Sequence, residues 1–192
     1  MQHRIKEILQ SSISVKALVL ADDNLIKNIA AATDLIIQTF QNKGKVLFCG
    51  NGGSAADAQH LAAEFSGRFY YDRDPLDAEA LHVNTSYLTA VANDYSYDEV
   101  YSRLVKAKGS QGDVLVAFST SGNSPNILKA METAASVGMK TIAFTGETGG
   151  KMKVLSDILL NVPSMDTPRI QESHITIGHI ICELVEAKLF PR

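Results

Sequence analysis

Residues 45–54 read Lys45-Val46-Leu47-Phe48-Cys49-Gly50-Asn51-Gly52-Gly53-Ser54, an apolar run followed directly by a glycine-rich turn. Such a run predicts a short buried strand, and the glycines predict a tight turn into a helix. Residues 113–124 repeat the arrangement, with the predicted strand Asp113–Phe118 followed by Ser119-Thr120-Ser121-Gly122-Asn123-Ser124. The N-terminus of a helix favours negative charge. Two such loops therefore predict one phosphorylated small molecule held at two strand ends.

The rest of the chain alternates between strand-like and helix-like patterns. Further strands are expected at 80–84, 141–144 and 158–162, and helices at 55–66, 87–92, 125–138 and 167–189. Ser124-Pro125 and Thr167-Pro168 have the residues typical of a helix start. This alternation predicts right-handed crossovers and an α/β three-layer sandwich with a mostly parallel central sheet. Ligands of such sheets bind at the carboxyl ends of the strands, where both loops fall.

Residues 4–43 lie outside the alternating pattern. Their apolar side chains recur at helical spacing, with Asp22-Asp23 as a turn between two helices. We interpret the chain as a single domain over 1–192, with this helical pair at 1–43 and an α/β core at 44–192. We expect the pair to pack on another subunit.

Composition excludes several classes of protein. The net charge of −3 and the lack of a basic block argue against a nucleic-acid partner. No apolar run is long enough for a membrane span, and the N-terminus lacks the apolar core of a signal peptide. Cys49 and Cys182 stand far apart without CxxC spacing, which favours a reducing, cytoplasmic location.

The first loop also matches the dinucleotide fingerprint G-x-G-x-x-A, but its context does not fit a nucleotide. The next predicted strand ends in Val83-Asn84 and lacks the acidic residue that holds a ribose. Ala55-Ala56 stands where a P-loop has Gly-Lys. We therefore expect no nucleotide cofactor. Ser54 is expected to cap the following helix, with Asp57 three residues on.

Titratable residues of two helices are the candidate reactive groups. His60 and Glu64 share one helix face, and a surface pair of Glu64 with Arg68 is the alternative reading. The last helix carries Gln171, His174 and His179 among isoleucines, and such polar groups need partners if they are buried. These side chains are suited either to a divalent metal such as zinc or to metal-free proton transfer, and both readings stay open. Because Gln171 and His179 are on the order of 12 Å apart along a helix, one shared site needs converging side chains or neighbouring subunits.

With these residues assembled, the chain resembles the sugar isomerase (SIS) domain family along nearly its whole length. The resemblance is carried by four stretches, namely Cys49–His60, Ala92-Asn93-Asp94-Tyr95, Ser119–Ser124 and Arg169-Ile170-Gln171-Glu172-Ser173-His174. It is strongest to the branch that isomerises seven-carbon sugar phosphates. The fold implied is flavodoxin-like, as the alternating pattern predicts.

The resemblance implies an activity and a site. The reaction would convert sedoheptulose 7-phosphate to D-glycero-D-manno-heptose 7-phosphate, early in the synthesis of lipopolysaccharide heptose, in a homotetramer with active sites between subunits. Glu64 would move the proton between C1 and C2 through an enediol, with His179 as the partner acid or base. Zinc would be held by His60, Glu64, Gln171 and His179. The sugar phosphate would contact Asn51, Gly52, Gly53, Glu64, Asn93, Asp94, Ser119, Thr120, Ser121, Ser124 and Gln171.

A non-enzymatic branch of the same family is the main alternative; it binds the bacterial replication initiator as a tetrameric scaffold. Met1–Lys6, Asp98–Tyr101 and Leu189–Pro191 resemble that branch. Its members lack the glutamate and the second histidine of the catalytic set, whereas this chain has Glu64 and His179. A sugar-phosphate-sensing domain is a third reading, but such domains usually accompany a DNA-binding module, for which we expect no room. The enzyme is the favoured interpretation.

Overall fold

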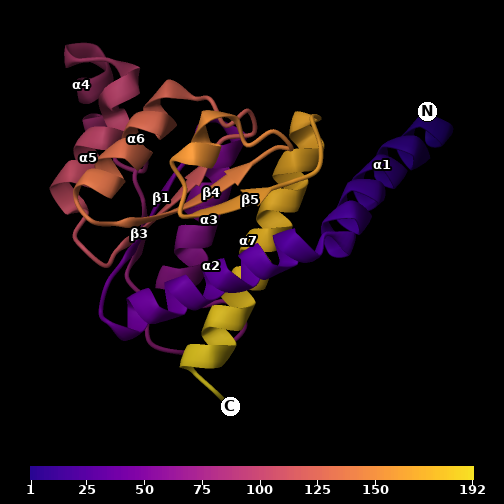
Figure 1. The fold of residues 1–192 in the computed structure, drawn as a ribbon, viewed down its shortest axis with the longest axis horizontal. Coiled ribbons are helices and arrows are strands. Elements are labelled where there is room, and N and C mark those ends of the chain that lie inside the picture. Colours follow the sequence, from indigo (N-terminus) through magenta and orange to yellow (C-terminus); the bar gives the residue numbers. More distant parts are fainter.

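The computed structural model describes residues 1–192 (Figure 1). Five strands alternate with helices along the chain after two N-terminal helices. The helices are α1 (Gln2–Ala21), α2 (Asp23–Gln41), α3 (Gly53–Ser66), α4 (Thr85–Asp94), α5 (Val100–Lys108), α6 (Pro125–Ser136) and α7 (Thr167–Leu189), with 3₁₀ turns η1 (Tyr97–Glu99) and η2 (Gly150–Val154). The strands are β1 (Val46–Cys49), β2 (Ala78–Ala80), β3 (Val114–Phe118), β4 (Lys140–Thr145) and β5 (Ile158–Asn161).

All neighbouring strands of the sheet are parallel, in the order β2-β1-β3-β4-β5. This is the flavodoxin-like order, whose switch point lies between β1 and β3. Cys49 pairs with Ala117 across these two strands. The loops that follow β1 and β3 therefore leave the sheet side by side. The predicted α/β class and parallel sheet are confirmed.

The sheet separates two apolar cores, because alternate strand residues face opposite sides. On one side, Val46 and Phe48 of β1 pack with α2, α3 and α7. On the other side, Leu47 and Cys49 pack with α4, α5 and α6. The site helices α3 and α7 thus share one face of the sheet.

The N-terminal helical pair divides at the predicted turn. Asp22 caps α2 by accepting hydrogen bonds from the N–H groups of Asn24 and Leu25, both at 3.0 Å. Helix α2 buries Leu25 and Ile29 in the core, whereas α1 has no buried residue and its N-terminal end projects away from the remainder of the chain (Figure 1). No helix of the chain has the length and apolar character needed to cross a membrane.

Three local expectations are wrong. The edge strand β2 covers Ala78–Ala80 and not 80–84, because the pattern there is too short and polar to set its ends. Helix α3 begins at Gly53 with Gly52 as N-cap, so Ser54 does not cap it; the φ of Gly52 is 57°, which glycine tolerates. Helix α5 was not anticipated at all. Its charged residues interrupt the apolar spacing over only 9 residues.

Candidate functional site

The first loop is held in place by a reciprocal amide pair. Asn51 Nδ2 donates to Asn126 Oδ1 and Asn126 Nδ2 donates to Asn51 Oδ1, both at 2.9 Å. The hydroxyl of Tyr97 donates to Asn51 Oδ1 at 3.2 Å, and that of Tyr101 donates to the Gly50 carbonyl. These contacts join the loop after β1 to α6, η1 and α5, and they fix the Asn51 side chain before any ligand binds.

The second loop gathers hydroxyl groups and free backbone donors. Ser119 Oγ lies 3.0 Å from Ser124 Oγ and 3.4 Å from Ser121 Oγ. The N–H groups of Thr120, Ser121 and Ser124 donate to no acceptor within the chain. Ser124 occupies the N-cap position of α6 as expected, but its hydroxyl contacts Ser119 in place of capping the helix. The loop thus offers several donors at a helix N-terminus, as an anion site requires.

The segment after β4 holds this loop in place through backbone hydrogen bonds. The Gly146 N–H donates to the Thr120 carbonyl at 2.9 Å, and the Met152 N–H donates to the Gly122 carbonyl at 3.0 Å. Gly122 is necessary here, because its φ is +66° and an added Cβ would lie 2.2 Å from the Gly149 carbonyl oxygen. A pocket of about 250 Å³ opens at this edge, lined by Thr120, Ser121, Asn123, Glu147, Thr148, Met165, Thr167 and Ile170.

His60, Glu64 and His179 form one cluster between α3 and α7. His60 Nε2 lies 2.9 Å from His179 Nε2 and 3.2 Å from Glu64 Oε1. One ligand atom from each of the three residues lies within 4.8 Å of the others. The alternative pair of Glu64 with Arg68 is not formed; Glu64 contacts His60 instead. The Glu64 side chain is 20% exposed, so it is accessible from solvent yet largely shielded.

A glycine allows the two helices to approach each other at this point. Gly178 precedes His179 on α7, and an added Cβ there would lie 2.4 Å from Leu61 Cδ1 on α3. Leu61 in turn follows His60. Because the backbone of α7 touches the Leu61 side chain directly, the two histidines are brought into contact from opposite helices.

Other predicted site residues lie elsewhere. Gln171 contacts the first turn of α3, since an added Cβ on Gly53 would lie 2.7 Å from Gln171 Nε2. Its amide is thus roughly 10 Å along α3 from His60, and its place among the metal ligands stays a prediction. Asn93 and Asp94 are exposed at the end of α4 and hydrogen-bond to each other at 2.9 Å. Helix α4 lies on the opposite side of the sheet from α7 (Figure 1).

His174 is an internal residue of the α7 face. Its Nε2 lies 3.0 Å from the Thr145 carbonyl oxygen, and its ring meets Phe118 and Phe144 edge-on. Burial lowers the pKa of His174 to about 4, against a smaller opposing effect of the Thr145 hydrogen bond. The neutral ring donates to the carbonyl at the end of β4. His174 therefore supports the carboxyl edge of the sheet and is not a member of the histidine cluster.

Asp57 lies one helical turn before His60 on α3. Its Oδ2 is buried without a hydrogen-bond partner. Burial raises the pKa of Asp57 to about 6, although His60 acts in the opposite direction. Unpartnered acids with a raised pKa are typical of functional clefts.

Sequence reasoning missed several supporting residues. Asn126 could have been recognised from the sequence. It follows Pro125 at the start of a helix, where the buried position would otherwise suit an apolar residue. Tyr97 and Tyr101 gave no such signal, because their contacts with Asn51 and Gly50 depend on how η1 and α5 pack.

The donor set of the cluster is chemically suited to a divalent metal ion. Two imidazole nitrogens and a carboxylate oxygen are ligands that zinc accepts, and three protein ligands leave a position for substrate or water. Without a metal, the same groups can exchange protons with a bound molecule. The cluster thus offers groups for metal binding or proton transfer, and the hydroxyl loop offers donors for an anion.

Comparison with known proteins agrees with this geometry. The sequence pattern of the SIS domain matches residues 14–146. The chain is 52% identical over 190 residues to a phosphoheptose isomerase of Aneurinibacillus thermoaerophilus, covering 99% of this chain and 96% of that protein. It is 50% identical over 194 residues to one of Burkholderia pseudomallei, covering 99% and 98%. A solved phosphoheptose isomerase structure from Neisseria gonorrhoeae superposes with a TM-score of 0.91 at 44% identity, covering 97% and 98% of the two chains. The chain belongs to the SIS domain family and groups with its phosphoheptose isomerases.

Proposed function

We propose that the chain converts sedoheptulose 7-phosphate to D-glycero-D-manno-heptose 7-phosphate, as an early step towards lipopolysaccharide heptose. The observation that carries the proposal is the contact of Glu64 and His179 with His60 in a chain of the phosphoheptose isomerase group. An aldose–ketose isomerase needs a base beside a carbon acid and a donor beside the carbonyl oxygen. Helix α3 supplies Glu64 as the base, and α7 supplies His179 as the donor.

The bond changes of the reaction are proton transfers between the substrate and side chains. The Glu64 carboxylate removes a proton from C1 of the open-chain ketose, while His179 donates a proton to the carbonyl oxygen on C2. The product of this step is an enediol. Glu64 then delivers its proton to C2, and His179 recovers a proton from the oxygen on C1, which leaves the aldehyde. Both side chains return to their starting protonation states.

The phosphate would bind the hydroxyl loop, in contact with Ser119, Thr120, Ser121 and Ser124. The free N–H groups of this loop support the assignment. The sugar would run towards Glu64, contacting Asn51, Gly52, Gly53 and Gln171. Asn93 and Asp94 stand at the end of α4, on the other side of the sheet from α7, and their contact with the sugar is part of the proposal.

Zinc is the metal we propose for His60, Glu64 and His179, with Gln171 as a further ligand if its side chain turns towards them. A bound zinc ion would polarise the oxygens on C1 and C2 and so favour loss of the carbon-bound proton.

A homotetramer is the proposed assembly. Helix α1 has no buried residue, and four of its apolar side chains are 42–59% exposed, namely Ile5, Ile8, Leu9 and Ile13. Contiguous apolar surface of this kind is typical of subunit contacts. Cys49 and Cys182 are both buried and free, in agreement with the proposed cytoplasmic location.

Incubation of the purified protein with sedoheptulose 7-phosphate tests the function. We expect the aldose product to form, and in deuterated water the product should carry deuterium at C2 because Glu64 exchanges its proton with solvent. A protein that binds the ketose without forming the aldose would overturn the proposal. Deuterium at C2 would support the enediol route over a hydride shift, because a hydride shift moves the C1 hydrogen to C2 without exchange.

A further inference from the structure

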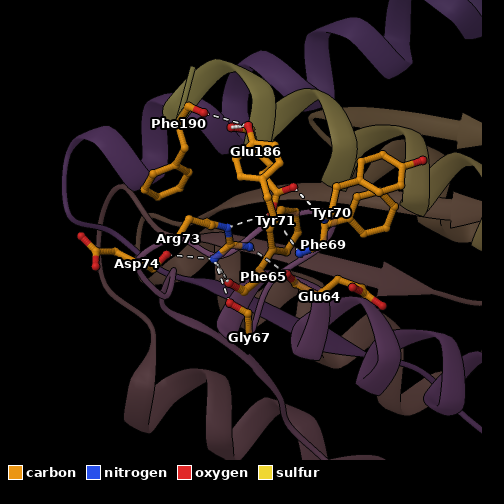
Figure 2. A network of polar contacts seen from close by, with 10 residues as sticks. All are labelled: Glu64, Phe65, Gly67, Phe69, Tyr70, Tyr71, Arg73, Asp74, Glu186 and Phe190. Atoms are coloured by element: carbon orange, nitrogen blue, oxygen red, sulfur yellow. Dashed lines mark hydrogen bonds and ion pairs between the residues drawn. The ribbon is translucent and has the colours of Figure 1, made fainter. Parts of the chain in front are cut away.

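We infer that the buried ion pair between Arg73 and Glu186 is a positioning device that sets the placement of Glu64 relative to His179. Neither residue forms a hydrogen bond or ion pair with the side chains of His60, Glu64 or His179. The pair instead joins the end of α3 to α7 through backbone groups (Figure 2). The expected effect of the pair on turnover rests on the proposed function. The effect of the pair on the distance between the two histidine rings can be measured independently of activity.

Glu186 is the centre of this network on α7. Its side chain is 1% exposed. The carboxylate accepts hydrogen bonds from the N–H groups of Phe69 at 2.9 Å and Tyr70 at 2.8 Å, and from Arg73 Nε at 3.1 Å. Burial acts to raise the pKa of Glu186, but these donors hold it below its usual value. An ionised carboxylate thus fixes the segment after α3 against α7.

Arg73 closes the network on the α3 side. Its side chain is 2% exposed. Nη2 donates to the carbonyl of Glu64 at 2.8 Å, and Nη1 donates to the carbonyls of Phe65 at 2.8 Å and Gly67 at 3.2 Å. A cation at the C-terminus of a helix is favourable, because the last carbonyls lack partners within the helix. The backbone of Glu64 itself is therefore held by Arg73.

The same segment also touches the other half of the cluster. Phe69, whose N–H binds Glu186, places its ring 5.6 Å from the His179 ring, centroid to centroid. Glu186 lies seven residues after His179, two turns along the same face of α7. A continuous set of contacts thus runs from Glu64 through Arg73 and Glu186 to Phe69 and His179.

Such a network is better explained by geometry than by stability alone. A buried ion pair gains little net stability over apolar side chains of the same size, because both charges lose their hydration. The hydrogen bonds of Arg73 and Glu186 do have fixed directions, however, and misplacing a reacting group by about 1 Å can cost on the order of 100-fold in rate. We therefore expect the pair to act on turnover more than on substrate affinity.

The test compares two buried carboxylates, each of which accepts hydrogen bonds from two backbone N–H groups and pairs with a cation. Glu186→Gln and Arg73→Lys weaken the network described here. Asp113→Asn is the matched control, because Asp113 is 4% exposed, accepts from the N–H groups of Lys45 and Ser110 at 2.9 Å each, and pairs with Lys45 Nζ at 2.8 Å. Asp113 precedes β3 and lies at the amino ends of the strands, whereas both site loops follow the carboxyl ends. Melting temperatures identify variants with matched loss of stability, and Arg73→Lys serves if Glu186→Gln does not fold.

Three readouts are taken on the full chain, namely kcat, KM and the nuclear Overhauser contact between the ring protons of His60 and His179. We expect Glu186→Gln and Arg73→Lys to lower kcat about 10- to 100-fold with KM changed less than about threefold, and to weaken the ring contact. Asp113→Asn should change none of these. Wild-type kcat and ring contact in either network variant would overturn the inference, as would equal losses in Asp113→Asn. If the wild type fails to turn over, the proposed function is wrong, and the ring contact alone then decides the positioning role.

Discussion

His60 Nε2 on α3 lies 2.9 Å from His179 Nε2 on α7, although 119 residues separate them in the sequence. Two nitrogens at this distance share one proton, since a hydrogen bond needs one donor and one acceptor. Glu64 Oε1 stands 3.2 Å from the same His60 nitrogen. His60 Nε2 is therefore within hydrogen-bonding distance of both His179 and Glu64.

The first prediction concerns the base. Glu64→Gln should lower kcat on the order of 10³-fold, because the amide cannot accept a proton while it keeps the size and hydrogen-bonding reach of the glutamate. KM should change little, since the hydroxyl loop is untouched. Initial rates with sedoheptulose 7-phosphate measure both constants. Glu183→Gln on α7, whose carboxylate contacts only the Tyr70 hydroxyl at 3.4 Å, is the control and should keep wild-type rates. Full activity in Glu64→Gln would assign the base to another group.

The second prediction concerns the metal. His60→Ala should reduce the zinc content of the purified protein, measured by elemental mass spectrometry, because it removes one of three converging ligands. His3→Ala is a matched control, since His3 is an exposed histidine on α1. Chelation of the wild type should lower kcat, and added zinc should restore it. Equal, substoichiometric zinc in all three proteins would remove zinc from the proposed site.

The sheet and its loops could be predicted because their signals are local. The run at 114–118 is apolar throughout and three of residues 50–53 are glycines, so β1, β3 and their loops follow from the sequence. The bounds of β2 could not be predicted, because Ala78-Glu79-Ala80 is short and holds a charge. Its pairing with β1 is decided by the neighbouring strand and not by its own composition.

Only part of the cluster of His60, Glu64 and His179 could be predicted from the sequence. His60 and Glu64 are four residues apart on one helix, so the sequence alone places them on the same helix face. Their contact with His179 depends on the close approach of α7 at Gly178, and no single-sequence pattern reports which helices will pack together. The network of Arg73 and Glu186 was missed for the same reason, since both residues look like ordinary surface charges until the segment after α3 is folded against α7.

The third prediction concerns the first loop. Asn126→Ala should raise KM about tenfold or more with a smaller effect on kcat, because Asn51 loses both amide hydrogen bonds and keeps only the contact with the Tyr97 hydroxyl. Thr133→Ala on the same helix is the control; its hydroxyl donates only to the Lys129 carbonyl. Steady-state kinetics at matched temperature separate the two constants. Unchanged KM in Asn126→Ala would mean that Asn51 does not hold the sugar.

The fourth prediction concerns Asp57. Its folded pKa is raised to about 6 by burial, so the carboxyl favours the folded state below pH 3.8 and loses that contribution as pH rises towards 6. Asp57→Asn removes the charge and should stabilise the protein by about 1–2 kcal/mol at pH 8, with no gain near pH 4. Denaturant unfolding at the two pH values measures this. A destabilised variant at pH 8 would show that the charged form has a favourable partner.

The fifth prediction concerns His174, whose pKa in the folded protein is lowered to about 4 by burial. Because the unfolded chain binds the proton more readily, the stability due to the neutral ring is complete above about pH 6.5 and is lost as pH falls towards 4. Up to about 3 kcal/mol should disappear over this window. His174→Gln keeps a donor for the Thr145 carbonyl but cannot be protonated, so its free energy of unfolding should fall less than that of the wild type between pH 7 and pH 4.5. His3→Gln should follow the wild type. The Asp57 contribution to stability has the opposite sign, so in the Asp57→Asn background the loss of stability between pH 7 and pH 4.5 should be steeper. A pH dependence of His174→Gln equal to that of the wild type would contradict the role assigned to His174.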